Sequence, residues 1–143
     1  MSRAADRPGG LRGQLARFFA VHHRDTPALL DRVGAQIESA IRSELATHPA
    51  LSVLTQRRFG GIVAIEAANP EDHGYLAPMG DMLCEACRAN SDVLLRPLGP
   101  ALYALPPACT SPDEAATIGR AIVKTYAMAW QRATSSPSSP THA

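Results

Sequence analysis

Lysine is almost absent from the sequence. Thirteen of the 14 basic residues are arginine, and the single lysine is Lys124. Schiff-base chemistry requires a lysine amine, so any such mechanism in this chain depends on that residue. The basic residues are also dispersed, and the formal net charge is only +1. We therefore expect neither a nucleic acid nor an anionic membrane as a partner.

Long hydrophobic runs are missing as well. No stretch approaches the roughly 20 apolar residues that span a bilayer, and the first residues lack the apolar centre of a signal peptide. The three cysteines are an odd number, which does not indicate a disulfide framework. We expect a cytoplasmic protein with reduced thiols, and 143 residues suit one compact domain.

Neither end of the chain has a long periodic pattern of apolar residues. Within residues 1–24, only residues 11–22 have enough apolar positions for a short helix. Residues 133–143 are rich in serine and proline. We expect both ends to be at least partly disordered.

Three segments between these ends carry helix signals. The first begins at Thr26-Pro27, repeats apolar residues every three or four positions, and is expected to stop near His48-Pro49. A second helix is expected over residues 74–88. The third begins at Ser111-Pro112-Asp113-Glu114, which has the form of a capping box with proline at the first helical position.

Strand signals lie between the helices. Residues 59–66 (FGGIVAIE) are apolar and β-branched, which favours one strand. A hairpin is expected from strand 93–96, a turn at residues 97–100, and strand 101–105. The order helix, strand, helix, hairpin, helix predicts an α/β layer in which helices cover one face of a short sheet.

The hairpin segment, DVLLRPLGPALYALPP at residues 92–107, resembles a signature near the C-terminus of class III pyridoxal-phosphate (PLP) aminotransferases. RRFGGIVAIE at residues 57–66 resembles a strand of the small domain in the same family. The resemblance spans roughly residues 25–132. It implies an α+β small domain with a short, mainly antiparallel sheet, as in the C-terminal domain of fold-type I PLP transferases. Residues 1–24 and 133–143 lie outside it.

The resemblance assigns two site residues. Arg96 matches the arginine that holds the substrate carboxylate, and Tyr103 matches a tyrosine of the same pocket, closest to the biotin-pathway branch of the family. Independently, a guanidinium fork matches a carboxylate in two hydrogen bonds, and a strand end beside a tight turn presents it rigidly. The alternatives are a surface arginine paired with a local acid, and a core tyrosine whose hydroxyl reaches the sheet edge.

The family also needs residues that this chain lacks. Its Schiff-base lysine, the acid at the pyridinium nitrogen and the phosphate site lie upstream in a large domain. Lys124 follows the substrate motif, so we expect it to be an exposed helix lysine. Residues 1–24 contain nothing like the family's Gly-Pro-Thr-Phe and Asn-Pro-Leu-Ala leader. We therefore predict no catalytic or cofactor-binding residue here, no activity for the chain alone, and a truncated or split gene product.

By resemblance, the parent enzyme transfers an amino group from S-adenosylmethionine to 8-amino-7-oxononanoate, making 7,8-diaminononanoate with PLP. Its active site lies at a homodimer interface. The partners implied for this chain are a large domain of the same enzyme or a homodimer mate. The alternative is a non-catalytic binding or interaction module that retains the small-domain fold.

Two other patterns indicate little chemistry. The Cys84-x-x-Cys87 spacing could belong to a zinc or redox site, but Cys109, His73 and the His22-His23 pair have no matching spacing, so we expect buried thiols and no metal. The histidine pair with Asp25 could form a general base, yet no nucleophile motif accompanies it. A surface helix end is expected there.

Overall fold

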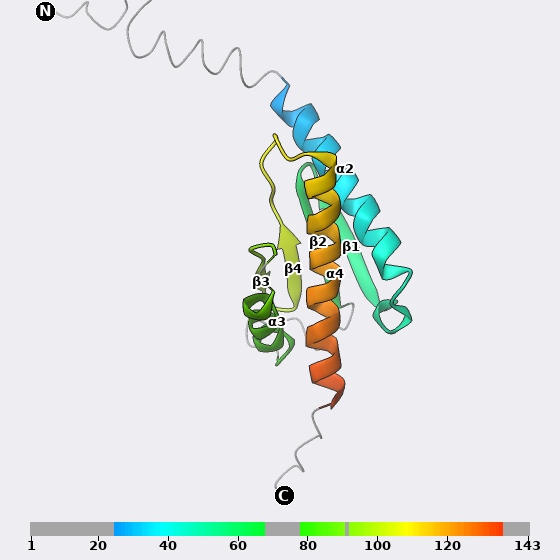
Figure 1. The fold of residues 1–143 in the computed structure, drawn as a ribbon. Coiled ribbons are helices and arrows are strands. Elements are labelled where there is room, and N and C mark those ends of the chain that lie inside the picture. Colours follow the sequence, from blue (N-terminus) through cyan, green and yellow to red (C-terminus); the bar gives the residue numbers. More distant parts are fainter. Residues whose placement is uncertain (1–24, 68–77, 91, 136–143) are drawn as a thin grey trace, which may run out of the picture.

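The computed structural model describes residues 25–67, 78–90 and 92–135. The predictions for residues 1–24, His73 and residues 136–143 therefore lie outside the described residues. Figure 1 shows the arrangement of the elements, which are in chain order α2 (Thr26–Leu45), the 3₁₀ turn η1 (Pro49–Leu51), β1 (Leu54–Phe59), β2 (Ile62–Ala67), α3 (Pro78–Ala89), β3 (Arg96–Leu98), β4 (Ala101–Ala104) and α4 (Pro112–Ser135).

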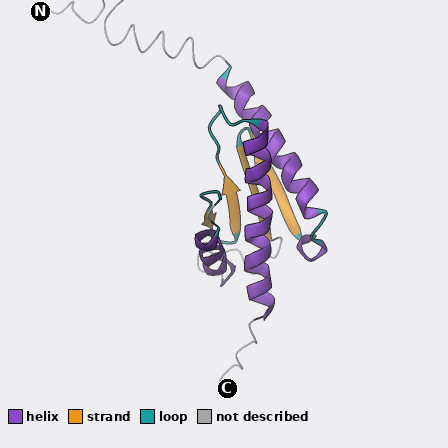
Figure 2. Ribbon diagram, in the orientation of Figure 1, coloured by secondary structure: helices purple, strands orange, loops and turns teal. Residues whose placement is uncertain are grey.

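The four strands form one antiparallel sheet in the order β1-β2-β4-β3. Helices α2 and α4 lie side by side on one face of this sheet, and α3 packs against α4 and β3 (Figure 2). The predicted fold class, a short antiparallel sheet covered by helices, is confirmed. The opposite face, which we call the open face, has none of the described helices on it.

The core lies between the sheet and its helices. Along β2 the side chains alternate, so that Val63 and Ile65 are fully buried while Ile62 is exposed. Leu102 of β4 belongs to the same buried face. Ile37 of α2 belongs to the same core cluster and is also fully buried. Burying side chains of this size stabilises the fold by about 1.5–3 kcal/mol each.

The single strand predicted over residues 59–66 was wrong. This segment contains a hairpin turn at Gly60-Gly61, where Phe59 pairs with Ile62 and Gly60 takes a φ of +54°. A glycine with positive φ at the first central position suits a two-residue hairpin. Strand β1 was missed because four polar residues fill its centre. At an outer edge of the sheet, such residues remain in contact with water.

The predicted hairpin exists, but its first strand was placed too early. Strand β3 is Arg96–Leu98 rather than residues 93–96, and the turn contains only Gly99 and Pro100, with Gly99 at a φ of +56°. Pro97, read as a turn residue, is tolerated in a strand because β3 is an edge strand that needs no donor on its outer side.

The capping box at the start of α4 is confirmed. The backbone N–H of Ser111 donates to Glu114 Oε2 at 2.8 Å, and the N–H of Glu114 donates to Ser111 Oγ at 3.3 Å. Helix α2 ends at Leu45, three residues before His48. Helix α3 ends at Ala89, one residue past the predicted end, and its predicted first residues, 74–77, lie outside the described residues. Helix α4 continues to Ser135, three residues past the predicted boundary at 132.

Candidate functional site

The sheet register brings the two predicted site residues together. Arg96 of β3 pairs directly with Tyr103 of β4, and Tyr103 in turn pairs with Ala64 of β2. Side chains on paired positions of neighbouring strands point to the same face. Because Leu102 and Ile65 are buried under the helices, Arg96 and Tyr103 share the open face.

Arg96 is exposed, and among the described residues its side chain forms no ion pair and no hydrogen bond. Other arginines differ. Arg57 contacts Glu66 at 2.6 Å, and Arg58 contacts both Asp31 and Glu38, the latter at 3.0 Å. Among the described residues, Arg96 is therefore not paired with a local acid, which was the alternative prediction.

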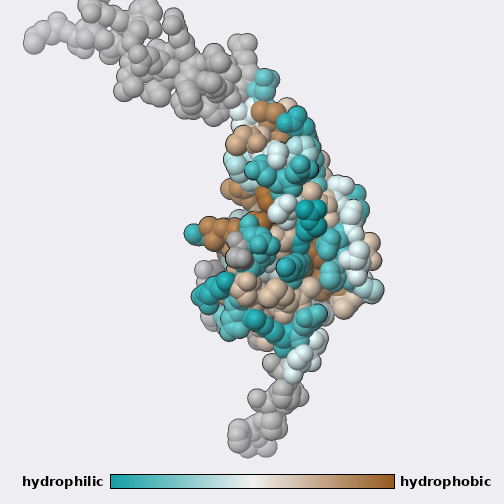
Figure 3. Space-filling model, viewed as in Figure 1, coloured by the Kyte–Doolittle hydropathy of each residue, from teal (hydrophilic) through white to brown (hydrophobic). Residues whose placement is uncertain are grey.

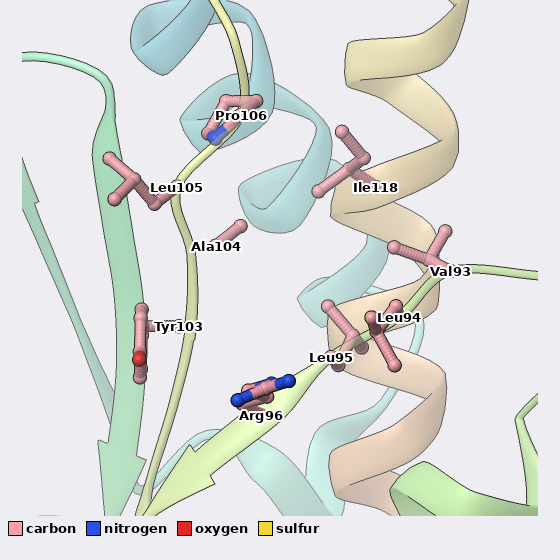
Figure 4. Close-up of a pocket in the computed structure, with 9 residues that line it drawn as sticks. All are labelled: Val93, Leu94, Leu95, Arg96, Tyr103, Ala104, Leu105, Pro106 and Ile118. Carbon is pink, nitrogen blue, oxygen red and sulfur yellow. The ribbon is translucent and has the colours of Figure 1, made fainter.

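A cavity of about 270 Å³ adjoins Arg96 and Tyr103. It forms because the chain segments on either side of the β3–β4 pairing separate: residues 93–95 lead into β3, and Leu105 and Pro106 follow β4. In Figure 4, Arg96 lies at one end of the group and Pro106 at the other, with Ile118 of α4 beside them. Arg96 is the only charged residue of the described lining. The remaining lining consists of Tyr103 and apolar residues.

Tyr103 is half-buried and lines this cavity. Within the described part of the chain, its hydroxyl has no hydrogen-bond partner. A core tyrosine usually bonds its hydroxyl to the protein. The role of Tyr103 in substrate binding stays a prediction, and its position beside Arg96 is compatible with it.

Large apolar side chains are exposed around the site. Leu94 is 87 % exposed, Phe59 84 %, Leu105 65 % and Leu98 57 %. Strongly hydrophobic residues are visible near the end of β4 even from the helix side (Figure 3). An exposed apolar group of this kind commonly marks an interaction surface. An exposed apolar surface is expected of a small domain separated from its large domain, but the sequence did not name these residues because the placement of β1 and β3 was needed to group them.

Lys124 is exposed on α4, as expected, and it does not line the Arg96 cavity. It lines a separate groove of about 520 Å³, together with Glu44, His48 and Arg120. The Glu44 carboxylate and the His48 ring lie 3.7 Å apart there. Arg96 and Lys124 therefore line different hollows of the described structure.

The CxxC pair lies on α3. Cys84 and Cys87 are half-buried on α3, and burial raises the pKa of the Cys87 thiol, with a smaller contribution from Cys84. A raised pKa lowers the thiolate fraction that both metals and oxidants need. Within the described ranges, no three potential metal ligands cluster. None of the helices in these ranges is both long and apolar enough to cross a membrane.

Known aminotransferases resemble this chain in sequence and in structure. No protein-family model matches the chain. The adenosylmethionine-8-amino-7-oxononanoate aminotransferase of Synechococcus elongatus is 44 % identical over 78 residues, which are 54 % of this chain and 18 % of that enzyme. The chain resembles one segment of an aminotransferase.

Solved transaminase structures share the fold of this aminotransferase-like segment. A transaminase structure with L-alanine has a TM-score of 0.61 at 22 % identity, covering 84 % of this chain and 28 % of that one. A PLP-bound amine transaminase from an uncultivated Pseudomonas species has a TM-score of 0.58 at 24 % identity, covering 79 % and 26 %. A transaminase from ancestral reconstruction gives 0.61 at 19 %, covering 82 % and 26 %. The segment thus spans about a quarter of these structures, in their C-terminal region.

Proposed function

We propose that this segment supplies the substrate-carboxylate site of a PLP-dependent aminotransferase. One observation carries the proposal: Arg96 has no acidic partner among the described residues, and it is held opposite Tyr103 at the mouth of an apolar cavity. A rigid strand presents the guanidinium fork, which favours two-point binding of a carboxylate.

For the substrates we propose 8-amino-7-oxononanoate as the amino acceptor and S-adenosylmethionine as the donor, giving 7,8-diaminononanoate. The name of the Synechococcus elongatus relative and its 44 % identity support this choice. In the proposal, Arg96 binds the carboxylate of the acceptor, and Tyr103 lines the same pocket. The reaction would take place in the cytoplasm, at the contact with a large domain or at a homodimer interface.

The described residues do not fit PLP by themselves. The single lysine, Lys124, lies on α4 outside the Arg96 cavity. We therefore expect the Schiff-base lysine and the other main PLP-binding residues to come from a large domain. The role left to this chain is to bind and orient the carboxylate end of the substrate. Alone, the chain is expected to be inactive.

The experiment mixes this chain with a large-domain chain of the Synechococcus elongatus type. Amino transfer to 8-amino-7-oxononanoate and PLP absorbance are measured for each chain alone and for the mixture. Activity only in the mixture supports the proposal. Arg96→Gln in the mixture should raise KM for the acceptor, whereas Arg88→Gln, an exposed arginine on α3 outside the cavities, serves as the matched control.

Activity of this chain alone would overturn the assignment, as would full activity of the Arg96→Gln mixture. The second candidate is a non-catalytic interaction module with the small-domain fold. The exposed Phe59, Leu98 and Leu105 favour it, because such a surface can dock a partner without any chemistry. A stable complex that lacks transfer activity and PLP absorbance would support this second candidate.

A further inference from the structure

Three exposed apolar residues lie in one row across the open face of the sheet. Phe59 of β1 pairs with Ile62 of β2. Val63 pairs with Ala104, so the next residue, Leu105, comes opposite Ile62. Phe59 is 84 % exposed, Leu105 65 % and Ile62 40 %. We call Phe59, Ile62 and Leu105 the apolar row.

The apolar row points away from the helices. Val63 is fully buried under them, and strand alternation turns Ile62 to the opposite face. In Figure 4, the side chain of Leu105 points to one side of its segment, whereas that of Ala104 points to the other side, toward Ile118 of α4. An exposed apolar group of this kind is typical of a surface that another segment covers.

The start of α2 lies at the same end of the sheet as the apolar row. Helix α2 crosses the β1–β2 turn at Gly34, where an added Cβ would overlap the carbonyl oxygen of Gly60. Residues 26–33 of the helix extend past this end of the sheet (Figure 1). The chain that precedes Thr26 therefore meets α2 beyond the edge that separates the helices from the open face.

This preceding chain carries apolar residues that suit the row. Two of the three phenylalanines in the sequence, Phe18 and Phe19, are adjacent, and with Leu15 they have the spacing of one helical face. Phe19 lies seven residues before Thr26, and seven extended residues reach at most about 24 Å. From Thr26 to Gly34, α2 rises about 12 Å, and neighbouring packed layers lie about 10 Å apart. The connection is therefore long enough to reach the open face.

We propose that residues 15–21 of this same chain dock on the apolar row, with Phe18 and Phe19 against it. Docking removes apolar side chains of both segments from water, and neither the row nor residues 18–21 (FFAV) carry a charge. The short connection gives the segment an effective concentration on the order of millimolar. That concentration favours it over a second copy of the chain. The inference uses neither Arg96 nor a large domain, so it is independent of the proposed function.

The test uses the photo-cross-linking residue p-benzoylphenylalanine in the full chain. It is placed at Leu105 and, as a control, at Thr55, which is exposed on the same face at the far end of β1. Monomeric and dimeric products are separated on a denaturing gel and digested with trypsin, which cleaves after Arg17 and Arg24. The cross-linker at Leu105 should mark the peptide of residues 18–24 within one chain. The cross-linker at Thr55 should not.

Paired variants test the two phenylalanines. Phe18→Ser combined with Phe19→Ser removes the aromatic surface and should weaken docking about tenfold or more, so the cross-linked product falls. Phe18→Leu combined with Phe19→Leu keeps an apolar surface and should retain most of the product. The serine pair should also increase the fluorescence of anilinonaphthalene sulfonate, because this dye binds exposed apolar surface.

Equal marking of residues 18–24 from Leu105 and from Thr55 would overturn the inference. Cross-linked product that survives the serine pair would do the same. Cross-links found only in the dimer would assign the apolar row to a second copy and would also contradict it. Marking from Leu105 in a chain whose large-domain mixture is inactive would refute only the proposed function.

Discussion

The hydroxyl of Tyr126 donates a hydrogen bond to the carbonyl oxygen of Pro100 at 2.8 Å. The hydroxyl oxygen of Tyr126 also accepts a hydrogen bond from the backbone N–H of Ala67, at 3.1 Å. Tyr126 is fully buried in α4, while Pro100 lies in the turn that joins β3 to β4. One core side chain thus ties the hairpin that carries Arg96 to the end of β2.

Replacing Tyr126 with phenylalanine should destabilise the fold. The variant keeps the ring but leaves the carbonyl of Pro100 and the N–H of Ala67 without this partner inside the core, which costs about 1–3 kcal/mol. Urea unfolding followed by circular dichroism measures the change. Tyr103→Phe is the matched control, because that half-buried hydroxyl has no partner among the described residues. Equal stability of the two variants would contradict the bridging role of Tyr126.

Gly34→Ala should destabilise the chain although alanine is the better helix former. In an exposed helix the change normally gains about 1 kcal/mol. Here an added Cβ would overlap the carbonyl oxygen of Gly60, in the β1–β2 turn. Overpacking of this kind costs about 1–3 kcal/mol, so thermal unfolding should occur at a lower temperature. Ser39→Ala, exposed on the same helix, should not lower it, and a stabilised Gly34→Ala would disprove the close packing.

The capping box should make stability depend on pH. Hydrogen bonds from the backbone and side chain of Ser111 lower the pKa of Glu114 in the folded chain. A carboxyl whose folded pKa is depressed adds stability above its unfolded pKa of about 4.3, and this contribution is lost as pH falls through the folded pKa.

Glu114→Gln retains a cap acceptor but does not titrate. The stability difference between the unchanged chain and Glu114→Gln should therefore shrink as urea unfolding is repeated from pH 7 down to pH 3. Ser111→Ala removes the cap itself and should lower stability at pH 7 by about 0.5–2 kcal/mol. A stability difference that stays constant across the pH range would argue against the Glu114 contacts.

The cysteines should react with iodoacetamide in a defined order. Cys109 is exposed, whereas Cys87 is half-buried with a raised pKa, so at pH 7.5 Cys109 should be alkylated first and Cys87 last. Peptide mass spectrometry over time resolves the three sites. In 6 M urea the order should disappear, because the burial is lost. Fastest labelling at Cys87 in the folded chain would instead indicate a reactive redox thiol.

Much of the fold follows from local signals in the sequence. The apolar spacing after Thr26-Pro27 and the Ser111 to Glu114 capping box located two helices within a few residues of their observed starts. The pairing of Arg96 with Tyr103 could not be predicted from local signals alone. Pro97 looks like a turn residue in any local reading, and only its place at the sheet edge allows it into a strand.

The cavity could not be predicted from the sequence. It depends on residues 93–95 and 105–106 lying outside the paired parts of β3 and β4, and on Ile118 of a separate helix lining the same hollow. These are tertiary relationships without a local signal. Strand β1 was missed for a related reason. Its pairing with β2 and the ion pairs of Arg58 with Asp31 and Glu38 of α2 stabilise this strand, although its sequence is polar.

Pro97 also limits how the sheet can grow. At the middle of the three-residue edge strand β3, it offers no N–H to an incoming strand. The other edge, β1, carries two adjacent arginines, and a row of charges discourages stacking of identical strands. Both margins therefore resist the edge-to-edge polymerisation that leads to fibrils, even though Phe59, Leu98 and Leu105 expose apolar surface beside them.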